Sequence, residues 1–417
     1  MSETISHIEK KRTLVPELRF KEFDGEWVNR KLDDISDKIQ DGTHFSPNTS
    51  DEGEYKYITS KNIRPGKLLL DNVEFISSED HKGIYKRCDV QYGDVLLTKD
   101  GASTGNVCLN TLKEEFSLLS SVAFIRADSD LSTNEFIYQT LYSPIGQREI
   151  FKAISGQAIT RITLTKLRNF SFRIPQVDEQ QKIASFLLAV DEKIQQLTRK
   201  KELLEDYKKG VMQQIFSQQL RFKDENGNDF PEWEEKTMKH VLTERNTQAP
   251  KNEEFPLMAF MAYKGVAPKG DRYDREFLVT DGDSKKYKQT GYGDFIYSSN
   301  NLETGSIGLN RYGSASISPV YSIFAINDNS SYEFMSSYLI RKEFINKMIR
   351  YRQGVMYGQW RIHESEFLKI VEKIPSLAEQ TKIAEFLSDV DKKIENVNQQ
   401  LTQTQTFKKG LLQKMFV

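Results

Sequence analysis

The spacing of apolar residues predicts two long amphipathic helices in this chain. From Ile183 to Ile215, apolar side chains recur in alternating steps of three and four residues, which is the 3.5-residue period of a coiled-coil seam. The same steps return from Ile383 to Met415. Each segment spans roughly 30 residues, so at about 1.5 Å per residue it would form a helix about 45 Å long. Polar residues interrupt both seams, at Lys201, Lys208, Thr404 and Lys408.

The two helical segments are copies of one another. Ile174–Phe216 and Ile374–Phe416 share the framework "IP…EQ.KIA.FL..VD.KI", two hundred positions apart. Two such similar apolar stripes in one chain are ready partners, so we expect the helices to pair with each other in antiparallel orientation. The alternative is that each seam packs on its own neighbouring domain, as an ordinary amphipathic helix does.

A second repeated element has a fixed frame and a variable centre. Residues 92–110 read "YGDVLLTKDGASTGNVCLN" and residues 292–310 read "YGDFIYSSNNLETGSIGLN". Both keep Tyr-Gly-Asp, Thr-Gly and Leu-Asn; we call them framed loops 1 and 2. A weaker match, Leu-Arg-Phe followed by Glu-Trp, opens each half at 18–27 and 220–233. The chain therefore alternates a variable region with a repeated helix, twice.

The variable regions have the pattern of mixed α/β domains. Short β-branched or aromatic runs such as "YKYITSKNI", "DVLLTKD", "SVAFIRA" and "FIYSSN" predict strands, whereas "TNEFIYQTLYSPIGQREIF" and "SYEFMSSYLIRKEFINKMI" have helical spacing. We predict an α+β protein with two mixed α/β domains in tandem, each followed by a long helix. The two helices would pair as an antiparallel coiled coil around a pseudo-twofold axis. The predicted divisions are an N-terminal extension (1–16), a first domain (17–173), a first helical spacer (174–218), a second domain (219–373) and a second helical spacer (374–417).

Charge and composition narrow the possible partners and compartments. The chain has 59 basic and 60 acidic side chains, for a net charge of −1. Proteins that coat nucleic acid nonspecifically are usually basic, so any DNA binding here should use local patches or a partner. The sequence shows neither an apolar run long enough for a membrane span nor a secretory signal, which predicts a cytoplasmic protein without a membrane partner. The two cysteines, Cys88 and Cys108, lack the spacing of a zinc site or a disulfide framework.

The sequence lacks the motifs of several catalytic sites. It has no G-x-G-x-x-G cofactor loop and no G-x-x-x-x-G-K-[ST] phosphate loop. It has no Pro-Pro dipeptide, which excludes the Asn/Asp-Pro-Pro-aromatic loop of amino-methyltransferases, and no Pro-Asp dipeptide, which opens many nuclease metal sites. We therefore expect no catalytic residue, no bound cofactor and no metal in this chain.

Over nearly its whole length, the sequence resembles the specificity subunit of type I restriction–modification systems. The features that carry the resemblance are the duplicated helix framework, both framed loops and the segment "DGTHFSP" at Asp41–Pro47. The second half has "ERNTQAP" (Glu244–Pro250) where a DGTH-like segment would stand, and its loop centre "YSSNN" differs from "LLTKDG".

The resemblance implies a function and a set of partners. Each variable region would be a target recognition domain for one half of a bipartite double-stranded DNA site, and the helices would set the spacing and dock two methyltransferase subunits. Those subunits would bind S-adenosylmethionine and methylate adenine N6, while separate restriction/translocase subunits would use ATP. The kept frame and changed centre of the loops suit two half-sites of different sequence, since different bases require different donors and acceptors.

Candidate DNA-contacting residues are polar side chains in and around the framed loops, because Arg, Lys, Asn and Gln read base edges while Ser, Thr and Lys mostly position phosphates. In the first domain they are Lys61, Arg64, Thr98, Lys99, Ser103, Thr104, Gln157 and Arg161. In the second domain they are Lys264, Ser298, Asn300, Asn301, Thr304, Tyr357, Gln359 and Arg361. The alternative for both framed loops is an ordinary hairpin whose glycines only form turns.

Two other functions stay open at this point. One is an enzyme whose methyltransferase or nuclease site has an unfamiliar sequence, which would show bound cofactor or metal-dependent cleavage. The other is a coiled-coil scaffold without a DNA role, whose partner binding would not change when the framed loops are exchanged.

Overall fold

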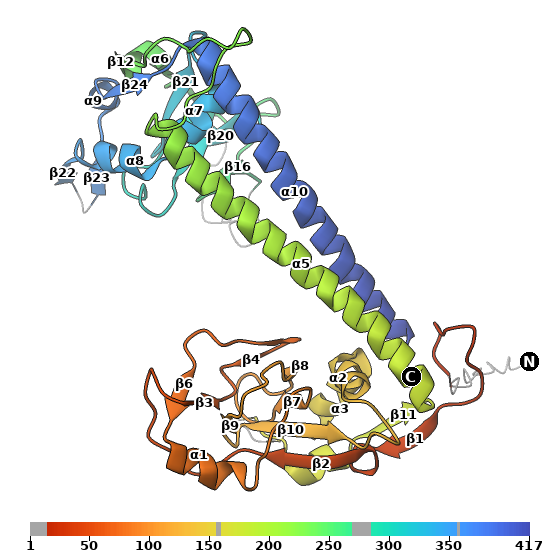
Figure 1. The fold of residues 1–417 in the computed structure, drawn as a ribbon. Coiled ribbons are helices and arrows are strands. Elements are labelled where there is room, and N and C mark those ends of the chain that lie inside the picture. Colours follow the sequence, from red (N-terminus) through yellow and green to blue (C-terminus); the bar gives the residue numbers. More distant parts are fainter. Residues whose placement is uncertain (1–14, 156–159, 269–284, 357–358) are drawn as a thin grey trace, which may run out of the picture. The chain divides into compact units, whose positions relative to one another are not determined.

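The computed structural model describes residues 15–155, 160–268, 285–356 and 359–417, and these form two compact units. Unit 1 contains residues up to Lys200 together with Val397–Val417, and unit 2 contains Lys201–Asn396. Two long helices, α5 (Val177–Phe216) and α10 (Leu377–Lys414), contribute to both units (Figure 1). They contain 40 and 38 residues, so both are longer than the segments that the sequence pattern predicts.

Unit 1 is built on a four-stranded antiparallel sheet with the strand order β2-β10-β7-β8. Its strands are β2 (Ser36–Asp41), β10 (Val122–Ala127), β7 (Val95–Thr98) and β8 (Val107–Leu109). Three smaller sheets complete the unit: β6 (Glu74–Ile76) with β3 (Tyr55–Ile58) and β9 (Ser117–Leu118), β4 (Ile63–Arg64) with β5 (Lys67–Leu68), and β1 (Val28–Lys31) with β11 (Ser171–Ile174). The short helices are η1 (Asp33–Ile35), α1 (Ser78–Tyr85), α2 (Asn134–Tyr142), α3 (Pro144–Ala153) and α4 (Leu164–Arg168).

The central sheet of unit 1 is covered on both faces, which explains its nearly continuous apolar strands. Val95 and Leu97 of β7 belong to the core that includes the helices α2 and α5, whereas Leu96 between them belongs to a second core beneath β3 and α1. In β10, Ile125 and Phe124 divide between the same two cores. Successive side chains of a strand point to opposite faces, so a strand buried on both sides has no polar alternation.

Unit 2 repeats this arrangement, with a four-stranded sheet in the order β13-β21-β18-β19. These strands are β13 (Leu242–Glu244), β21 (Ser322–Ile326), β18 (Phe295–Tyr297) and β19 (Ile307–Leu309). The other strands are β14 (Gln248–Pro250), β17 (Lys286–Thr290) and β20 (Ala315–Ile317), β15 (Ala259–Met261) and β16 (Gly265–Ala267), β22 (Gln353–Met356) and β23 (Gln359–Arg361), and β12 (Glu234–Thr237) and β24 (Val371–Ile374). The helices are α6 (Met238–Val241), α7 (Tyr332–Tyr338), α8 (Lys342–Ile349) and α9 (Glu364–Phe367). The predicted α+β class is confirmed.

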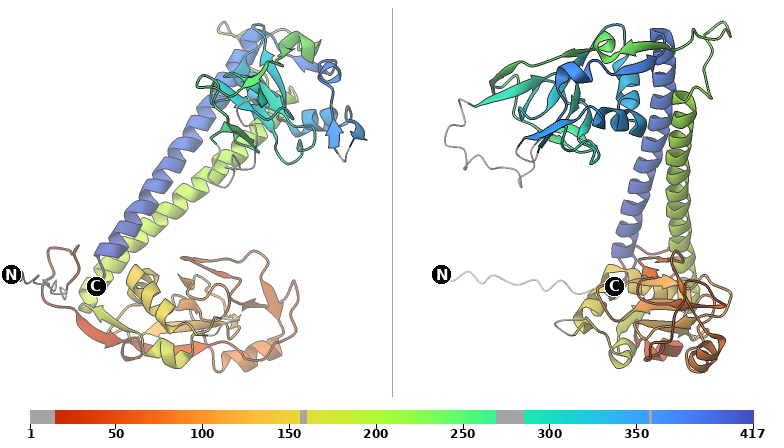
Figure 2. Two further views of the ribbon diagram at one scale, coloured as in Figure 1. Left: turned by 180° about the vertical axis from the view of Figure 1, so that it is seen from behind. Right: turned by 90° about the vertical axis from the view of Figure 1, so that its left-hand side faces the viewer.

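Within each unit, the beginning of one long helix lies beside the end of the other (Figure 2). In unit 1, Leu187 of α5 and Leu411 of α10 share a core with the central sheet. In unit 2, Val211 of α5 and Leu387 of α10 do the same. The helices are thus antiparallel inside each unit, and their apolar seams pack on the neighbouring domain as well as on each other. Within each unit, the seams therefore do both: they pair with the other helix and they pack on the neighbouring domain. A continuous coiled coil along the whole length of α5 and α10 stays a prediction.

Two of the lysines that interrupt the seams, Lys408 and Lys208, form ion pairs with the other long helix. Lys408 is buried, and its Nζ lies 2.5 Å from Asp191 Oδ1, while Gln139 Nε2 donates to Asp191 Oδ2 at 2.9 Å. Burial lowers the pKa of Lys408, although the Asp191 charge acts in the opposite direction. In unit 2, Lys208 pairs with Asp391 at 2.6 Å in a more exposed position. A paired charge in a seam is a device that can fix the register of two helices.

The repeated Leu-Arg-Phe segment ties the start of each domain to a helix N-terminus. Arg19 holds Glu179 with two hydrogen bonds of 2.7 Å, and Arg221 holds Glu379 at 3.2 and 3.0 Å. Both glutamates are buried and lie in the first turns of α5 and α10, where the helix dipole also favours a negative charge. A bidentate contact between a guanidinium and a carboxylate fixes the geometry of both groups, so the repeated Leu-Arg-Phe segment has a structural role in each unit.

Candidate nucleic-acid interface

The frame that the two loops share forms the same turns in both units. In framed loop 1, Gly93 N–H donates to the Asn110 carbonyl at 2.9 Å, and Asn110 N–H donates to the Asp94 carbonyl at 2.8 Å. In framed loop 2, Gly293, Asn310 and Asp294 make the same two bonds, both 2.8 Å long. Gly93 and Gly293 have φ values of +87° and +84°, a region that side chains disfavour. The frame is therefore kept because the backbone requires it.

The frame aspartates also fix neighbouring arginines. Asp94 accepts hydrogen bonds from Arg126 at 3.0 and 2.8 Å, and Asp294 lies 2.8 Å from Nε of Arg245. Burial raises the pKa of Asp294, although hydrogen bonds from the Gly291 backbone and the Thr290 hydroxyl and the charge of Arg245 favour its ionised form. These carboxylates are structural parts of the turn.

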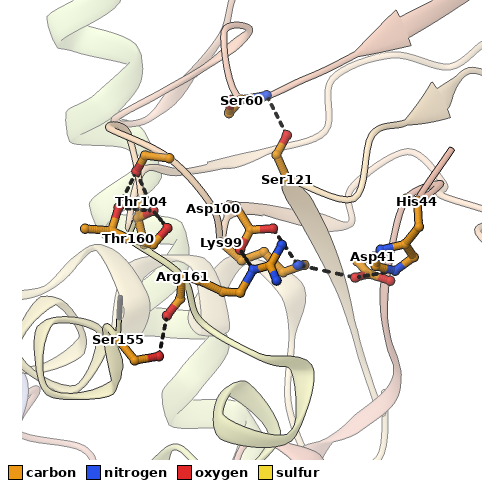
Figure 3. A network of polar contacts seen from close by, with 12 residues as sticks. Asp41, His44, Ser60, Lys99, Asp100, Thr104, Ser121, Ser155, Thr160 and Arg161 are labelled. Atoms are coloured by element: carbon orange, nitrogen blue, oxygen red, sulfur yellow. Dashed lines mark hydrogen bonds and ion pairs between the residues drawn. The ribbon is translucent and has the colours of Figure 1, made fainter. Parts of the chain in front are cut away.

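In unit 1, an ionic chain joins three segments at the end of the central sheet where β2 and β7 both finish, and we call this end of the sheet its edge (Figure 3). Arg161 Nε donates to Asp100 Oδ1 at 3.1 Å, and Lys99 Nζ donates to Asp100 Oδ2 at 2.9 Å. Lys99 also lies 3.4 Å from Asp41 Oδ2. Asp41 in turn pairs with Arg87 at 3.2 Å and with His44 Nε2 at 3.3 Å. The chain brings the DGTH segment, framed loop 1 and the segment around Arg161 together.

The interior of the ionic chain is buried and its ends are exposed. The side chains of Lys99 and Asp41 are only 5% and 4% exposed. The side chains of Arg161 and His44 are 62% and 65% exposed. A buried charge is tolerated when it is paired, so the inner three residues act as a support. The exposed side chains of Arg161 and His44 at the ends are the groups that an incoming anion or base edge would meet.

Backbone and hydroxyl contacts fix the same edge. Gly101 N–H donates to the Thr160 carbonyl at 2.9 Å, and the hydroxyls of Thr104 and Thr160 both donate to the Gly101 carbonyl at 2.6 Å. The Ser60 amide donates to the Ser121 hydroxyl at 3.3 Å, which attaches the segment before β4 to the same edge (Figure 3). The framed loop is thus held in one conformation from both sides.

The predicted contact residues of the first domain lie in different environments. Lys61, Arg64 and Arg161 are exposed, and the β4–β5 hairpin that carries Arg64 adjoins framed loop 1 through Asn106 Nδ2, which donates to the Ile63 carbonyl at 3.0 Å. Ser103 and Thr104 are half-buried, and Thr104 closes the turn. Thr98 and Lys99 are buried, so their side chains support the surface and do not form it. Gln157 lies outside the described residues.

The corresponding edge of unit 2 is built from other side chains. Asn300 Oδ1 accepts from the backbone N–H of Trp360 at 2.6 Å, and the Ser299 hydroxyl accepts from Ile362 N–H at 3.0 Å. Arg361 Nη2 lies 3.7 Å from Glu364 Oε2. In both units the framed loop is held against a segment that carries an exposed arginine; in unit 1 Arg161 forms isolated bridges, and in unit 2 Arg361 ends the strand β23.

Glu364 is the counterpart of the buried support in unit 1. Its Oε1 accepts a hydrogen bond from the Ser322 hydroxyl at 2.8 Å and lies 3.9 Å from Lys288 Nζ. Burial by itself would raise the pKa of Glu364, but hydrogen bonds from its own backbone and from Ser322 and the charges of Lys288 and Arg361 lower it. Glu364 is therefore a fixed negative charge beside Arg361.

The predicted contact residues of the second domain also divide by exposure. Lys264, Asn300, Asn301, Thr304 and Arg361 are exposed, whereas Ser298 is buried. The Thr304 hydroxyl donates to the Asn301 carbonyl at 3.2 Å, the same kind of turn contact that Thr104 makes. Tyr357 and the side chain of Gln359 lie outside the described residues.

Sequence reasoning gave no role to the carboxylates that support these edges or to one cation, Arg87. Asp41 stood in the quoted DGTH segment, but nothing in the sequence paired it with Lys99 or Arg87. Asp100 and Glu364 also received no role. The available signal was only an acidic residue close to a candidate cation, which is common on any surface.

Other chemistry is not indicated in the described parts of the chain. They contain no group of three or more His, Cys, Asp or Glu side chains that could hold a metal ion. Burial raises the pKa of both Cys88 and Cys108 to about 12, so these thiols are not poised nucleophiles. Across the same described segments, no helix has the length and apolar character needed to cross a membrane.

Comparison with known proteins decides what kind of protein has this arrangement. The profile of the family described as "Type I restriction modification DNA specificity domain" matches residues 24–206 and again residues 231–405. The chain belongs to this family. As a member, it is a DNA sequence-specificity subunit and not a catalytic one. The two matches coincide with the two halves of the internal repeat.

Relatives of this family match over most of the chain. A putative type I restriction enzyme MjaX specificity subunit of Methanocaldococcus jannaschii is 24% identical over 407 residues, which cover 94% of this chain and 93% of the relative. The crystal structure of a type I restriction–modification system S subunit from M. genitalium has a TM-score of 0.60 at 17% identity and covers 97% of this chain and 99% of that one. A structure from a study of type I R–M complex assembly has a TM-score of 0.53 at 14% identity and covers 93% and 97%. The structural likeness supports the fold.

Proposed function

We propose that each unit reads one half of a bipartite double-stranded DNA site. The observation that carries the proposal is found in both units: turns with the same backbone hydrogen bonds hold a framed loop of different composition beside an exposed arginine. A scaffold protein would have no reason to keep the turns while replacing the exposed side chains between them. Base edges differ in their donor and acceptor pattern, so two half-sites of different sequence require this combination.

The exposure of the side chains narrows the contact residues. Arg161, Lys61 and Arg64 in unit 1 and Arg361 and Lys264 in unit 2 are accessible. Exposed Asn300, Asn301 and Thr304, with half-buried Ser103 and Thr104, are secondary candidates. Thr98, Lys99 and Ser298 act as buried supports in this proposal. With a net charge of −1, the chain would rely on these local groups and on a partner for its affinity.

The proposed partners are those that membership of the specificity-subunit family implies. Two methyltransferase subunits would dock on α5 and α10, bring S-adenosylmethionine, and methylate an adenine of each half-site after extruding it from the duplex. Restriction/translocase subunits would supply the ATP-dependent step. The chain itself would hold no cofactor, and its contribution would be the choice and orientation of the site.

The test is to assemble the chain with its methyltransferase subunit and select bound duplexes from a randomised DNA pool at 150 mM salt. The proposal predicts enrichment of a split motif with an unspecified spacer, and a loss of that enrichment when framed loop 1 is replaced by a Gly/Ser segment of equal length. A stable complex that enriches no motif would support the scaffold function instead. Methylation of DNA by the chain alone with S-adenosylmethionine would support the enzyme.

A further inference from the structure

We propose that Arg161 and Arg361 each read a guanine of their half-site, and that Asp100 and Glu364 are positioning residues that hold the guanidinium groups for this contact. The inference rests on the proposed function and names the base pair and the residues that determine part of its specificity.

The first argument is the way in which Arg161 is held. Its Nε donates to Asp100 Oδ1 at 3.1 Å, and its backbone pairs with Ser155 through bonds of 2.9 and 3.1 Å. Its backbone also forms a bridge with residue Asp100. The side chain is nevertheless 62% exposed. A guanidinium engaged at Nε still offers two further nitrogens, and two parallel donors match the O6 and N7 acceptors of guanine.

The second argument is that the holding carboxylate is itself fixed. Asp100 is 11% exposed and accepts from Lys99 at 2.9 Å, and Lys99 is tied to Asp41 at 3.4 Å. Arg161 therefore extends from a buried ionic support and not from a flexible surface. A side chain that is ordered before binding loses less freedom when it binds, which favours a directional contact.

The third argument is charge. Asp100 lies 3.1 Å from Arg161 Nε and partly balances its charge, so Arg161 attracts a phosphate less strongly than an unpaired cation would. The major-groove edge of guanine is neutral and offers acceptors, so a directional hydrogen bond to it depends less on the net charge of the arginine. A phosphate contact would be better served by an exposed lysine such as Lys61, which has no carboxylate partner among the described ion pairs.

The fourth argument is the second unit. Arg361 occupies the equivalent position, is 67% exposed, and has Glu364 Oε2 at 3.7 Å. Its carboxylate comes from three residues later in the chain, whereas that of Arg161 comes from the framed loop. Glu364 is again fixed from behind, by Ser322 at 2.8 Å. The two repeats have thus kept a held arginine while its partner has changed, which points to a function of the arginine itself.

The experiment maps N6-methyladenine by single-molecule sequencing after co-expression of the full chain with its methyltransferase subunit in a methylation-deficient host. The wild-type motif is expected to contain a guanine on one strand in each half. Arg161→Gln should reduce discrimination at one such guanine of a single half by about 5- to 150-fold, the range for one bidentate base contact. Arg361→Gln should do the same in the other half. Arg30→Gln, an exposed arginine of β1, is the matched control and should leave the motif unchanged.

The positioning role has its own readout. Glu364→Ala should relax the same base position as Arg361→Gln without a change at any other position. Arg361 and Glu364 form an ion pair at 3.7 Å and not a hydrogen bond, so Glu364→Gln, which keeps an oxygen for Ser322 but removes the charge, should relax the same base position. A role of Glu364 in folding alone would instead lower methylation at all sites equally and lower the midpoint of thermal unfolding.

Three results would overturn the inference. One is a split motif without guanine in either half. Another is a uniform loss of methylation in Arg161→Gln with unchanged base preference, which is the signature of a phosphate contact. Both leave the proposed function intact. The third is the absence of any split motif with the wild-type complex, which would refute the proposed function and this inference together.

Discussion

Replacement of Lys99 by Met is the sharpest test of the ionic chain as a structural support. The Lys99 side chain is 5% exposed and lies between Asp100 at 2.9 Å and Asp41 at 3.4 Å, whose side chains are 11% and 4% exposed. Removing one partner of a buried ion pair costs about 3–5 kcal/mol, because a charge is left without compensation. Each aspartate here keeps another cation, Arg161 or Arg87, so we expect the low end, about 3 kcal/mol.

The assay can be confined to unit 1 because the three tryptophans are distributed between the units. Trp27 is buried in unit 1, and Trp233 and Trp360 belong to unit 2. In a background with Trp233→Phe and Trp360→Phe, tryptophan fluorescence during urea unfolding reports on unit 1. The midpoint for Lys99→Met should fall by the amount that corresponds to about 3 kcal/mol, while the exposed Lys61→Met should change stability by less than about 0.5 kcal/mol.

A second substitution separates charge from packing. Lys99→Met combined with Asp100→Asn removes one uncompensated charge and keeps an oxygen for Arg161, so it should recover at least about 1 kcal/mol of the loss. A loss below about 1 kcal/mol for Lys99→Met, as is typical of surface ion pairs, would refute the reasoning. A double variant that is less stable than the single one would refute it too.

Three further predictions concern other parts of the chain. Cys88 and Cys108 have pKa values raised to about 12 by burial, so iodoacetamide at pH 7.5 should label neither in the native protein and both in urea, as mass spectrometry would show; labelling of the native protein would contradict their burial. The Lys408 pKa lies below its unfolded value of 10.5, so the folded chain binds that proton less tightly than the unfolded chain does, and wild type should gain stability over Lys408→Met as the pH rises towards 10.5. Urea unfolding at pH 7 and pH 9.5 measures the difference, and an unchanged or reversed difference would contradict the burial of the ammonium. Gly105→Ala should lose about 1 kcal/mol or more, because φ at Gly105 is +98°, whereas Gly210→Ala should gain up to about 1 kcal/mol, because Gly210 lies in a helix with open space around it. Thermal unfolding compares these two variants, and equal effects would contradict the turn.

The helices and the strands were predictable because their determinants are local. The seam of α5 and α10 and their duplication can be read directly from residue spacing, and the strand character of "DVLLTKD" and "SVAFIRA" follows from their apolar and β-branched content. The frame of the loops was also recognisable, since Gly93 and Gly293 mark backbone that only glycine adopts easily. These features depend on residues within a few positions of each other.

The composition of the interface was only partly predictable, because it depends on contacts across the chain. Thr98, at the end of β7, and Ser298, directly after β18, have the polarity of surface residues, but both side chains are buried. Lys99 was proposed as a DNA contact from its charge, yet Asp41, distant in sequence, draws it inward. Lys408 breaks the apolar pattern of the seam, and only the structure shows that it pairs with Asp191. Sequence pattern does not show which carboxylate a lysine will meet.

The most direct test of the central claim is an exchange of one recognition domain. Residues 17–173 would be replaced by the aligned segment of another member of the family with a different known motif, and N6-methyladenine would be mapped in cells that also express the methyltransferase subunit. The account predicts a hybrid split motif in which one half changes and the other half stays as in wild type. An unchanged motif, or changes in both halves from this single exchange, would contradict the claim that each unit reads its own half-site.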